Sequence, residues 1–305
     1  MVALLRQSNA FLEELAHPIA RVFDLPYLPP HFPALVYAFL GFYVLHLVVS
    51  PLLSARLFPV SYGKLATRRQ INNWNIQVVS FLHVFVVVPL AARCLWSESL
   101  NEDRAFGWDD KLGTTVAVAC GYFLWDCVDG ILNFDDVGFI VHGVSCFIIY
   151  MGIFRPFLGY YACRFLSWEL STIFLNIHRF LDRTGRTGST AQAVNGAFLL
   201  GTFFFARIVW GWYKTVDLYL TLYAARDEIS LGYFVIYGCG SSALHSLNAM
   251  WMYKMVLALK KRFDGSDSKP KVHTNGTAKI NGGLNGAAKG LANGYANGKA
   301  NGKAE

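Results

Sequence analysis

The sequence predicts an all-α, polytopic membrane protein, and three observations lead to that fold class. The chain has 305 residues, of which 54% are hydrophobic and only 15% are charged. Soluble globular domains carry about 25% charged residues, so this composition indicates a chain embedded in lipid. The apolar residues gather into seven segments, each close to the roughly 20 residues that span a bilayer. The net charge of +7 comes from Lys and Arg that flank these segments. That pattern is a membrane topology signal and not a nucleic-acid site.

The predicted spans follow one another with short connections. They cover residues 33–53, 74–95, 112–132, 137–155, 157–178, 191–213 and 231–259. Only Arg155-Pro156 separates the fourth span from the fifth, which predicts a tight helical hairpin. The first thirty residues mix charges, prolines and apolar residues, with no clean hydrophobic region and no small-residue cleavage site. No signal peptide is therefore expected.

The positions of Lys and Arg predict the orientation of the chain. With seven spans, three basic regions share one side of the membrane. Their residues are Arg56, Lys64, Arg68, Arg69, Arg179, Arg183, Arg186, Lys260, Lys261, Arg262, Lys269 and Lys271. The loop at 98–110, on the other side, is mainly acidic. The positive-inside rule then places the basic regions and the C-terminus in the cytosol and the N-terminus in the lumen.

The chain is expected to divide into three parts. Residues 1–64 hold an N-terminal segment with the first transmembrane helix, and residues 65–263 hold a domain of six transmembrane helices. Residues 264–305 repeat Asn-Gly among Ala and Lys, which predicts a disordered cytosolic tail. Asn275 begins a glycosylation sequon there, which a cytosolic location leaves unmodified. The six cysteines show no CxxC or Cys/His spacing, so no metal site is expected.

Ionisable residues cluster where the third and fourth spans meet. Asp126 and Asp129 precede a turn at 133–136, and His142 follows it. At 1.5 Å per residue, Asp129 and His142 each lie about 10 Å from the turn, on neighbouring antiparallel helices. We therefore expect a hydrogen-bonded Asp129–His142 pair in which the carboxylate orients the imidazole as a general base. Two alternatives stay open: His142 is a structural histidine, and Asp126 pairs with an arginine and only stabilises packing.

Further polar side chains recur at helical spacing in the other spans. Glu169 and Asn176 are seven residues apart, and His245 and Asn248 are three apart, so each pair shares one helix face. Such groups are costly in lipid, which predicts a polar cavity that opens to the cytosol beneath an apolar roof. The expected ligand-binding residues are Asp126, His83, Glu169, Asn176, His245 and Asn248.

Other interpretations of individual residues remain open. Glu169 can instead form a structural ion pair with Arg164, and His83 can be either a packing or a binding residue. His46 is expected to have no partner. His178 is expected to reach the membrane interface. The sixth span also contributes two polar residues, Asn195 and Arg207.

Six motifs in a fixed order carry a family resemblance. They are Asn73-Trp74-Asn75, Gly121-Tyr122-Phe123-Leu124-Trp125-Asp126, Val141-His142-Gly143, Trp168-Glu169-Leu170-Ser171-Thr172 with Phe174-Leu175-Asn176, Phe205-Ala206-Arg207, and Leu247-Asn248-Ala249-Met250-Trp251-Met252. Over residues 65–265 the chain resembles the TLC-domain family of translocating-chain-associating, longevity-assurance and ceroid-lipofuscinosis proteins. The resemblance is closer to the TLC-domain-containing branch than to the ceramide synthases.

The resemblance implies a barrel of six helices around a lipid-binding cavity, preceded by one extra transmembrane helix, in the endoplasmic reticulum. It also implies that synthase members N-acylate a sphingoid base with acyl-CoA and carry two adjacent histidines. Here His142 matches the first histidine, and Gly143 stands at the second position. A glycine supplies neither a base nor a donor, so the departure weakens acyl transfer without excluding it.

Two functions are therefore weighed, ahead of a transporter or channel. The first is a lipid-homeostasis protein that binds a lipid or acyl chain in its cavity and influences membrane composition. The second is an acyl-CoA-dependent acyltransferase that uses His142 with Asp129. Membrane lipids are the expected partners and nucleic acid is not. No cofactor is expected, with acyl-CoA as co-substrate only in the enzyme. The lipid and the oligomeric state stay open.

Overall fold

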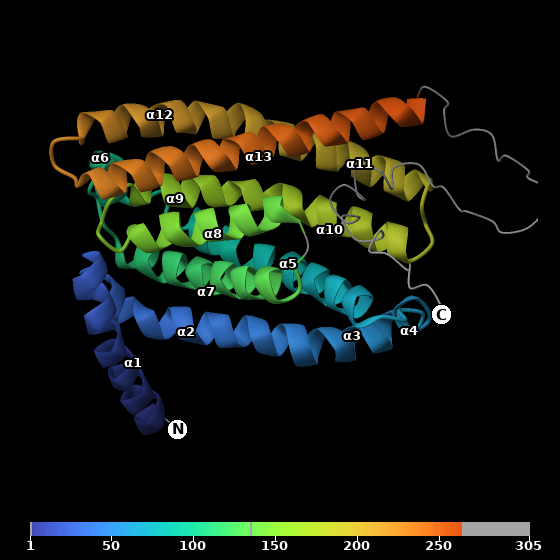
Figure 1. Ribbon diagram of the computed structural model, residues 1–305, viewed down its shortest axis with the longest axis horizontal. Helices are drawn as coiled ribbons and strands as arrows, with labels where there is room; N and C mark the ends of the chain where they lie inside the picture. The colour runs from blue at the N-terminus through green and yellow to red at the C-terminus, as the bar shows by residue number, and fades with distance from the viewer. Residues whose placement is uncertain (1, 135, 264–305) are drawn as a thin grey trace, which may run out of the picture.

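The computed structural model describes residues 2–134 and 136–263, and within these residues the regular elements are all helices (Figure 1). The predicted tail, with its sequon at Asn275, lies outside the described residues, as does Asp135. The elements η1 and η3 are π-helical and η2 is a 3₁₀ turn. The elements are α1 (Val2–Phe23), α2 (Leu28–Val44), η1 (Leu45–Val49), α3 (Ser50–Leu57), α4 (Pro59–Gly63), α5 (Arg68–Ala92), α6 (Glu98–Glu102), α7 (Asp110–Leu132), α8 (Val137–Gly152), α9 (Gly159–Phe165), η2 (Leu166–Glu169), α10 (Leu170–Arg183), α11 (Thr190–Phe203), η3 (Phe204–Trp210), α12 (Gly211–Ala224) and α13 (Leu231–Phe263).

Polar caps fix where several of these helices begin. The Thr67 side chain accepts from the backbone N–H of Gln70, and the Gln70 side chain accepts from the backbone N–H of Thr67, which forms a capping box at α5. Asp109, Asp136 and Ser189 cap α7, α8 and α11 by accepting from backbone N–H groups of the first turn. Each cap satisfies a donor that has no partner within the helix. The cap at Asp136 thereby sets the depth of His142 in α8.

Length and composition support the predicted class. Among the described residues, four helices are long and apolar enough to cross a membrane: Leu28–Leu57, Arg68–Ala92, Asp110–Leu132 and Thr190–Ala224. Val137–Gly152 is apolar but shorter. The all-α, multi-pass class is confirmed, and the number of seven crossings stays a prediction. The predicted fifth span is interrupted, since η2 separates α9 from α10.

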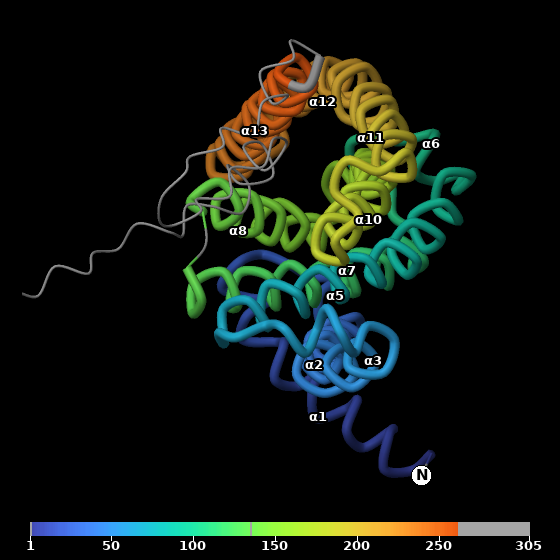
Figure 2. The backbone as a smooth tube through the Cα atoms, turned by 90° about the vertical axis from the view of Figure 1, so that its right-hand side faces the viewer, coloured from blue at the N-terminus to red at the C-terminus, as the bar shows by residue number. Residues whose placement is uncertain are grey.

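The helices that follow α4 form a closed ring, which is seen end-on in Figure 2. Going round the ring, α5 packs against α7, α7 against α8, and α8 against α13. Helix α13 contacts the α11–η3–α12 segment, and the α9–η2–α10 segment closes the ring between α11 and α5. Bundles of this kind place their binding sites between facing helices. A binding site is therefore expected in the interior of the ring.

Two helices lie outside the ring. The continuous segment α2–η1–α3 packs along α7 and α5, and α1 packs on α2 (Figure 1). Helix α1 was not among the predicted spans. Its 22 residues contain charges and an internal proline, Pro18, so it has no long apolar run.

The two ends of the bundle differ in charge and closure. We call the end with α4 and the α10–α11 connection the basic end, at the right of Figure 1. Its charged residues include Arg56, Lys64, Arg68, Arg69, Arg183 and Arg186. At the opposite end, the connection at 153–158 folds inward, and Ile153, Phe154, Phe157 and Leu158 are each at most 1% exposed. The Leu158 N–H donates to the Ala105 carbonyl at 2.7 Å. This packed connection closes the ring at the opposite end.

Candidate functional site

Two adjoining cavities occupy the interior of the ring. One contains about 620 Å³ of space free of protein atoms, and the other contains about 890 Å³. His142 and Glu169 line both of them. The two residues thus stand where one cavity gives way to the other.

The smaller cavity is apolar and lies toward the closed opposite end. Aromatic and aliphatic side chains from α7, α8, α9, α12 and α13 make up most of its wall. They include Phe123, Tyr150, Phe165, Leu166, Leu218 and Leu244. Its polar groups are few, and His245 is one of them. Such a wall offers dispersion contacts and almost no hydrogen bonds, which suits a hydrocarbon chain.

The larger cavity, called the polar cavity below, extends toward the basic end and carries more polar groups in a wall that is still largely apolar. Its wall carries amide, hydroxyl and charged groups from α5, α7, α10 and η3. These residues are Gln77, Ser80, Asp126, Ser171, Thr172 and Arg207. Phe139, Arg179 and Met255 also line it, nearer the basic end. The Gln77 side-chain oxygen is buried without a hydrogen-bond partner. An unpaired buried acceptor is costly, so this wall favours a ligand with polar atoms.

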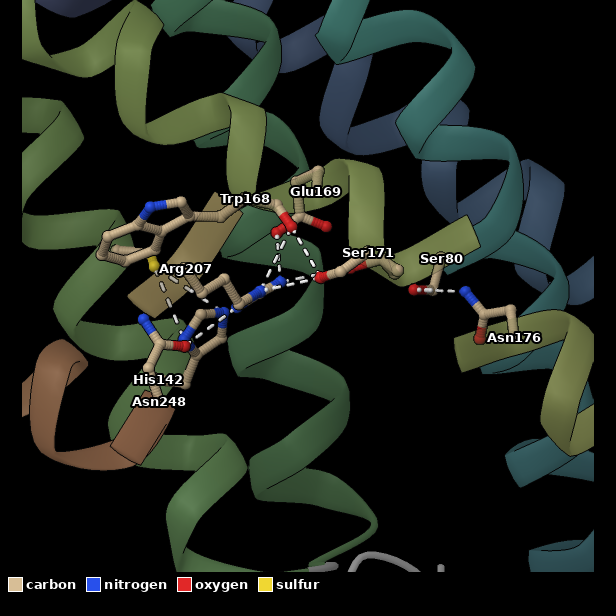
Figure 3. A network of polar contacts seen from close by, with 10 residues as sticks. Ser80, His142, Trp168, Glu169, Ser171, Asn176, Arg207 and Asn248 are labelled. Atoms are coloured by element: carbon tan, nitrogen blue, oxygen red, sulfur yellow. Dashed lines mark hydrogen bonds and ion pairs between the residues drawn. The ribbon is translucent and has the colours of Figure 1, made fainter. Parts of the chain in front are cut away.

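Arg207 is the centre of the polar network in this wall (Figure 3). Its Nε donates to the Trp168 carbonyl at 3.1 Å and to Ser171 Oγ at 3.0 Å. One terminal nitrogen donates to Asn248 Oδ1 at 3.2 Å. The other lies 3.5 Å from Glu169 Oε1 and also donates to Thr172, at 3.3 Å. Arg207 is 5% exposed, so nearly all of its hydrogen-bonding capacity is met by protein groups.

Irregular turns of the helices bring these groups together. Arg207 lies in the π-helical turn η3, and Trp168 and Glu169 lie in the 3₁₀ turn η2. π-Helical turns occur frequently at functional sites, and a wide or tight turn redirects side chains relative to a regular α-helix. Gly211, at the start of α12, lets the Trp168 ring pack directly against the backbone. A Cβ at this position would lie 3.0 Å from the indole nitrogen, which is closer than side chains normally approach. The approach of η2 to η3 thus depends on a residue without a side chain.

Most predicted site residues face this interior. His142, Glu169 and His245 line the apolar cavity, and His142, Glu169 and Asp126 line the polar one. Two more act through neighbours, since Asn248 accepts from Arg207 and Asn176 donates to Ser80 Oγ at 3.1 Å. Figure 3 shows the contacts of Arg207 with Asn248 and Ser171 and, separately, the contact of Asn176 with Ser80.

The predicted Asp129–His142 pair is wrong. Asp129 lies instead against the α2–η1–α3 segment, with its carboxylate 3.8 Å from His46 Nδ1 in η1. It also accepts from Asn72 at 3.3 Å and from Asn133 at 2.9 Å. The expectation that His46 has no partner is therefore also corrected. Asp126 and Asp129 diverge because α7 packs between the ring interior on one side and α2–η1 on the other.

His142 has a different environment from the one expected of an oriented base. Its ring lies 3.8 Å from the Cys146 thiol, one turn along α8. The Trp251 ring stands across it with centroids 5.5 Å apart. A thiol and an indole hold the imidazole in place without the negative charge that a carboxylate would bring.

Three other expectations also change. His83 is fully buried and stacks on Tyr122 with ring centroids 3.5 Å apart, so it is a packing residue outside the cavity wall. Arg164 donates to Asn101 at 2.8 Å and covers the Tyr160 ring, so Glu169 pairs with Arg207 and not with Arg164.

His178 does not reach the interface. It is buried, with its Nε2 3.3 Å from the Gln192 amide.

Gly143 is the position where the chain departs from the synthase motif, and the packing explains it. A Cβ at Gly143 would lie 2.9 Å from Asp126 Oδ2 and 3.2 Å from Cys127 Sγ. The close contact of α7 with α8 thus has no room for a side chain here unless both neighbours move. A second imidazole does not fit between the helices as they are packed.

The site residue missing from the prediction is Arg207. It was noted as a polar group of the sixth span but not placed in the site. Its signal was present: a lone arginine in an apolar run is costly unless buried partners satisfy it. Those partners come from η2, α10 and α13, which are distant in the sequence.

The ring and its cavities define a polytopic helical membrane protein with an enclosed interior. The chain matches the TLC domain over residues 73–257, and it belongs to the TLC-domain family. It is 34% identical over 281 residues to an uncharacterized TLC domain-containing protein of Schizosaccharomyces pombe, covering 91% of this chain and 96% of that one. It is 30% identical to TLC domain-containing protein 4-B of Danio rerio, covering 80% and 94%.

A third relative is topoisomerase I damage affected protein 4 of Saccharomyces cerevisiae, which is 24% identical with 76% of this chain and 85% of that one covered. No solved structure matches the chain. The predicted family is confirmed, and the two more similar relatives carry the name of the TLC-domain-containing branch that the motifs resembled.

Proposed function

We propose that this protein binds a membrane lipid, with a hydrocarbon chain in the apolar cavity and the headgroup in the polar cavity, and so influences membrane lipid composition. The observation that carries the proposal is that the two cavities meet at His142 and Glu169. An amphiphile has the same division, with an apolar part and a polar part joined at one point. Because the apolar and polar cavities match the apolar and polar parts of such a molecule, a lipid fits this interior best.

Physical chemistry indicates which cavity selects the ligand. A lipid tail leaves a bilayer as apolar as the cavity it enters, so its transfer contributes little affinity. Discrimination then comes from the headgroup, whose polar atoms must find partners among the buried groups around Gln77, Asp126 and Arg207. The rigid Arg207 network holds these partners in fixed positions.

We place the mouth of the site in the cytosol and the protein in the endoplasmic reticulum. The cavity extends toward the basic end, and the positive-inside rule assigns that end to the cytosolic side. The connection at 153–158 closes the other end. Exchange of lipid with the cytosolic leaflet fits this one-sided arrangement.

Acyl transfer from acyl-CoA is the second candidate, because His142 stands at the junction where a thioester would lie. In that reaction the amine attacks the thioester carbon, His142 accepts the amine proton, and the CoA thiolate leaves. The geometry supports this candidate less, since no carboxylate among the described residues contacts His142, and Gly143 stands at the position of the second histidine.

The proposal is tested by lipid mass spectrometry on the purified full-length protein. Ser241 lines the apolar cavity, so Ser241→Phe fills it. Ser246 is exposed on the same helix, so Ser246→Phe is the matched control. We expect a co-purified lipid in the wild type and in Ser246→Phe, and its loss in Ser241→Phe. Equal lipid content in the two variants, or no lipid in the wild type, contradicts the proposal.

A further inference from the structure

Helix α1 carries an apolar face that no other part of the described chain covers. Leu4, Phe11, Leu15 and Val22 recur at intervals of seven and four residues, so they lie on one side of the helix. All four are exposed, with Phe11 at 64% and Val22 at 76%. This face stands apart from the lipid-binding cavity, and the inference below does not depend on the proposed function.

The opposite face of α1 is polar. Arg6, Glu13 and His17 recur at the same intervals, and their helix angles place them about half a turn from the apolar residues. A helix with one apolar and one charged face, and little apolar character overall, is the kind that lies in the interface of a bilayer. The chain thus supplies the two faces that an interfacial position needs.

A third, narrow side of α1 attaches it to the bundle. Ala16 and Ala20 are buried against α2. The Tyr37 hydroxyl of α2 donates to Asn9 Oδ1 at 2.9 Å and lies equally close to Ser8 Oγ. Contacts through small residues leave the apolar face free.

The turn between α1 and α2 fixes the position of α1 along the length of the bundle. Asp24, in the turn between the two helices, forms an ion pair with Arg155 at 2.5 Å. The Tyr233 hydroxyl donates to the Phe23 carbonyl at 2.8 Å, and the Tyr27 N–H donates to the Phe154 carbonyl at 3.0 Å. These contacts hold the C-terminus of α1 to the end of the bundle opposite the basic end.

We propose that α1 is an interfacial helix that lies in the bilayer leaflet at the opposite end, with its apolar face in the acyl region and its polar face in water. Figure 1 shows α1 leaving the bundle at a steep angle to the membrane-spanning helices. The neighbouring helix α2 also exposes apolar side chains, among them Leu40 and Val44. A lipid leaflet is the one partner that covers both surfaces at once. Burial of about 5–10 Å into the headgroup and acyl boundary is usual for such helices.

The test uses full-length protein reconstituted at one copy per phosphatidylcholine nanodisc. Phe11→Cys reports the apolar face, and His17→Cys reports the polar face; both side chains are exposed in the wild type. A membrane-impermeant maleimide is added, and labelling of the α1 peptide is read by mass spectrometry, with labelling in SDS as the full value. Reading the α1 peptide alone removes the contribution of Cys239, which is exposed in α13.

We expect Phe11→Cys to react several-fold more slowly than His17→Cys in nanodiscs and at the same rate in SDS. Equal rates in nanodiscs overturn the proposal, because the apolar face then contacts water. Discs loaded with two copies test the other occupant of this face, a second chain. If Phe11→Cys is protected only in those discs and cross-links across copies, α1 is a dimer interface and the proposal is also overturned.

Discussion

The Arg207 guanidinium and the Glu169 carboxylate lie 3.5 Å apart inside the helical ring, and both border the polar cavity. Each charge is nearly removed from water, with side-chain exposures of 6% and 12%. A buried ion pair of this kind leaves a wall that is polar but close to neutral. It also leaves each partner dependent on the other, because an unpaired charge at this depth is strongly unfavourable.

Removing one partner of this pair is expected to cost more stability than removing both. Glu169→Met or Arg207→Met leaves an uncompensated buried charge, which typically costs about 3–5 kcal/mol. The double variant removes both charges, so its loss should be smaller than either single loss, and the coupling energy in a double-mutant cycle should reach about 3 kcal/mol or more in magnitude. Apparent melting temperatures of the detergent-purified variants measure it. Strictly additive losses contradict a direct interaction.

Gly143→His is expected to destabilise the protein and not to create activity. The new Cβ would meet Asp126 Oδ2 and Cys127 Sγ at 2.9 and 3.2 Å, and overpacking of this kind costs about 1–3 kcal/mol. Gly130→Ala on α7 is the matched control, since a Cβ there meets Ile140 at an ordinary 3.6 Å. Gly143→His should melt at a clearly lower temperature than the wild type, and Gly130→Ala should melt close to it. A Gly143→His protein as stable as the wild type shows that the helices open easily.

Substitution of the two aspartates of α7 is expected to have different effects. Asp129→Asn weakens the contact with His46, which holds the α2–η1–α3 segment against the ring. The melting temperature should therefore fall, while the lipid content should stay unchanged. Asp126→Asn changes the polar cavity wall, so lipid content or identity should change with a smaller loss of stability. Melting curves and lipid mass spectrometry on the same preparations separate the two. The reverse assignment would mean that Asp129 serves the cavity.

His142→Ala distinguishes the two candidate functions. As a lipid-binding protein, the wild type should not N-acylate a sphingoid base with acyl-CoA, yet His142→Ala should alter lipid content because the residue lines both cavities. If the protein is instead an acyltransferase, loss of the general base typically lowers the rate roughly 10²–10⁴-fold. Turnover across several acyl-CoA lengths and amine acceptors is the measurement. Robust turnover that requires His142 overturns lipid binding as the sole function.

The orientation of the chain is open to direct measurement. A protease added to sealed microsomes should remove a tag at the C-terminus, since the basic regions are expected on the cytosolic face. Protection of that tag, or a glycan on Asn275, would reverse the orientation or imply an even number of crossings. It would also move the mouth of the cavity to the lumen.

The fold could be predicted from the sequence further than the site could. Apolar segment length predicts membrane-spanning helices because lipid leaves the backbone no other partners than its own. Helix α1 escaped this criterion, since Arg6, Glu13 and His17 interrupt its apolar residues. The seven-and-four spacing of Leu4, Phe11, Leu15 and Val22 was the available signal. Amphipathic periodicity, and not mean apolarity, identifies such a helix.

The site was predicted by depth but not by direction. Counting residues from the turn places Asp129 and His142 at similar depth. The orientation of α7 about its axis, however, directs Asp126 to the cavity and Asp129 to His46 in η1. That rotation depends on how α7 packs between α2 and α8, which involves contacts distant in the sequence. The same limit hid the partners of Arg207.

Because of the π-helical turns η1 and η3, the insertion or deletion of a single residue in these helices changes which side chains face the interior. His46 lies in η1 and Arg207 in η3, so each wide turn carries one of the buried charge-bearing contacts. A π-helical turn holds an extra residue relative to a regular turn. Deleting one residue within Phe204–Trp210 would remove that extra residue and let the regular helix resume, so Arg207 and the other residues of the turn would change direction while α12 keeps its own. Insertions and deletions are usually confined to loops. Within this helix, one such change would decide whether the Arg207 guanidinium points into the ring.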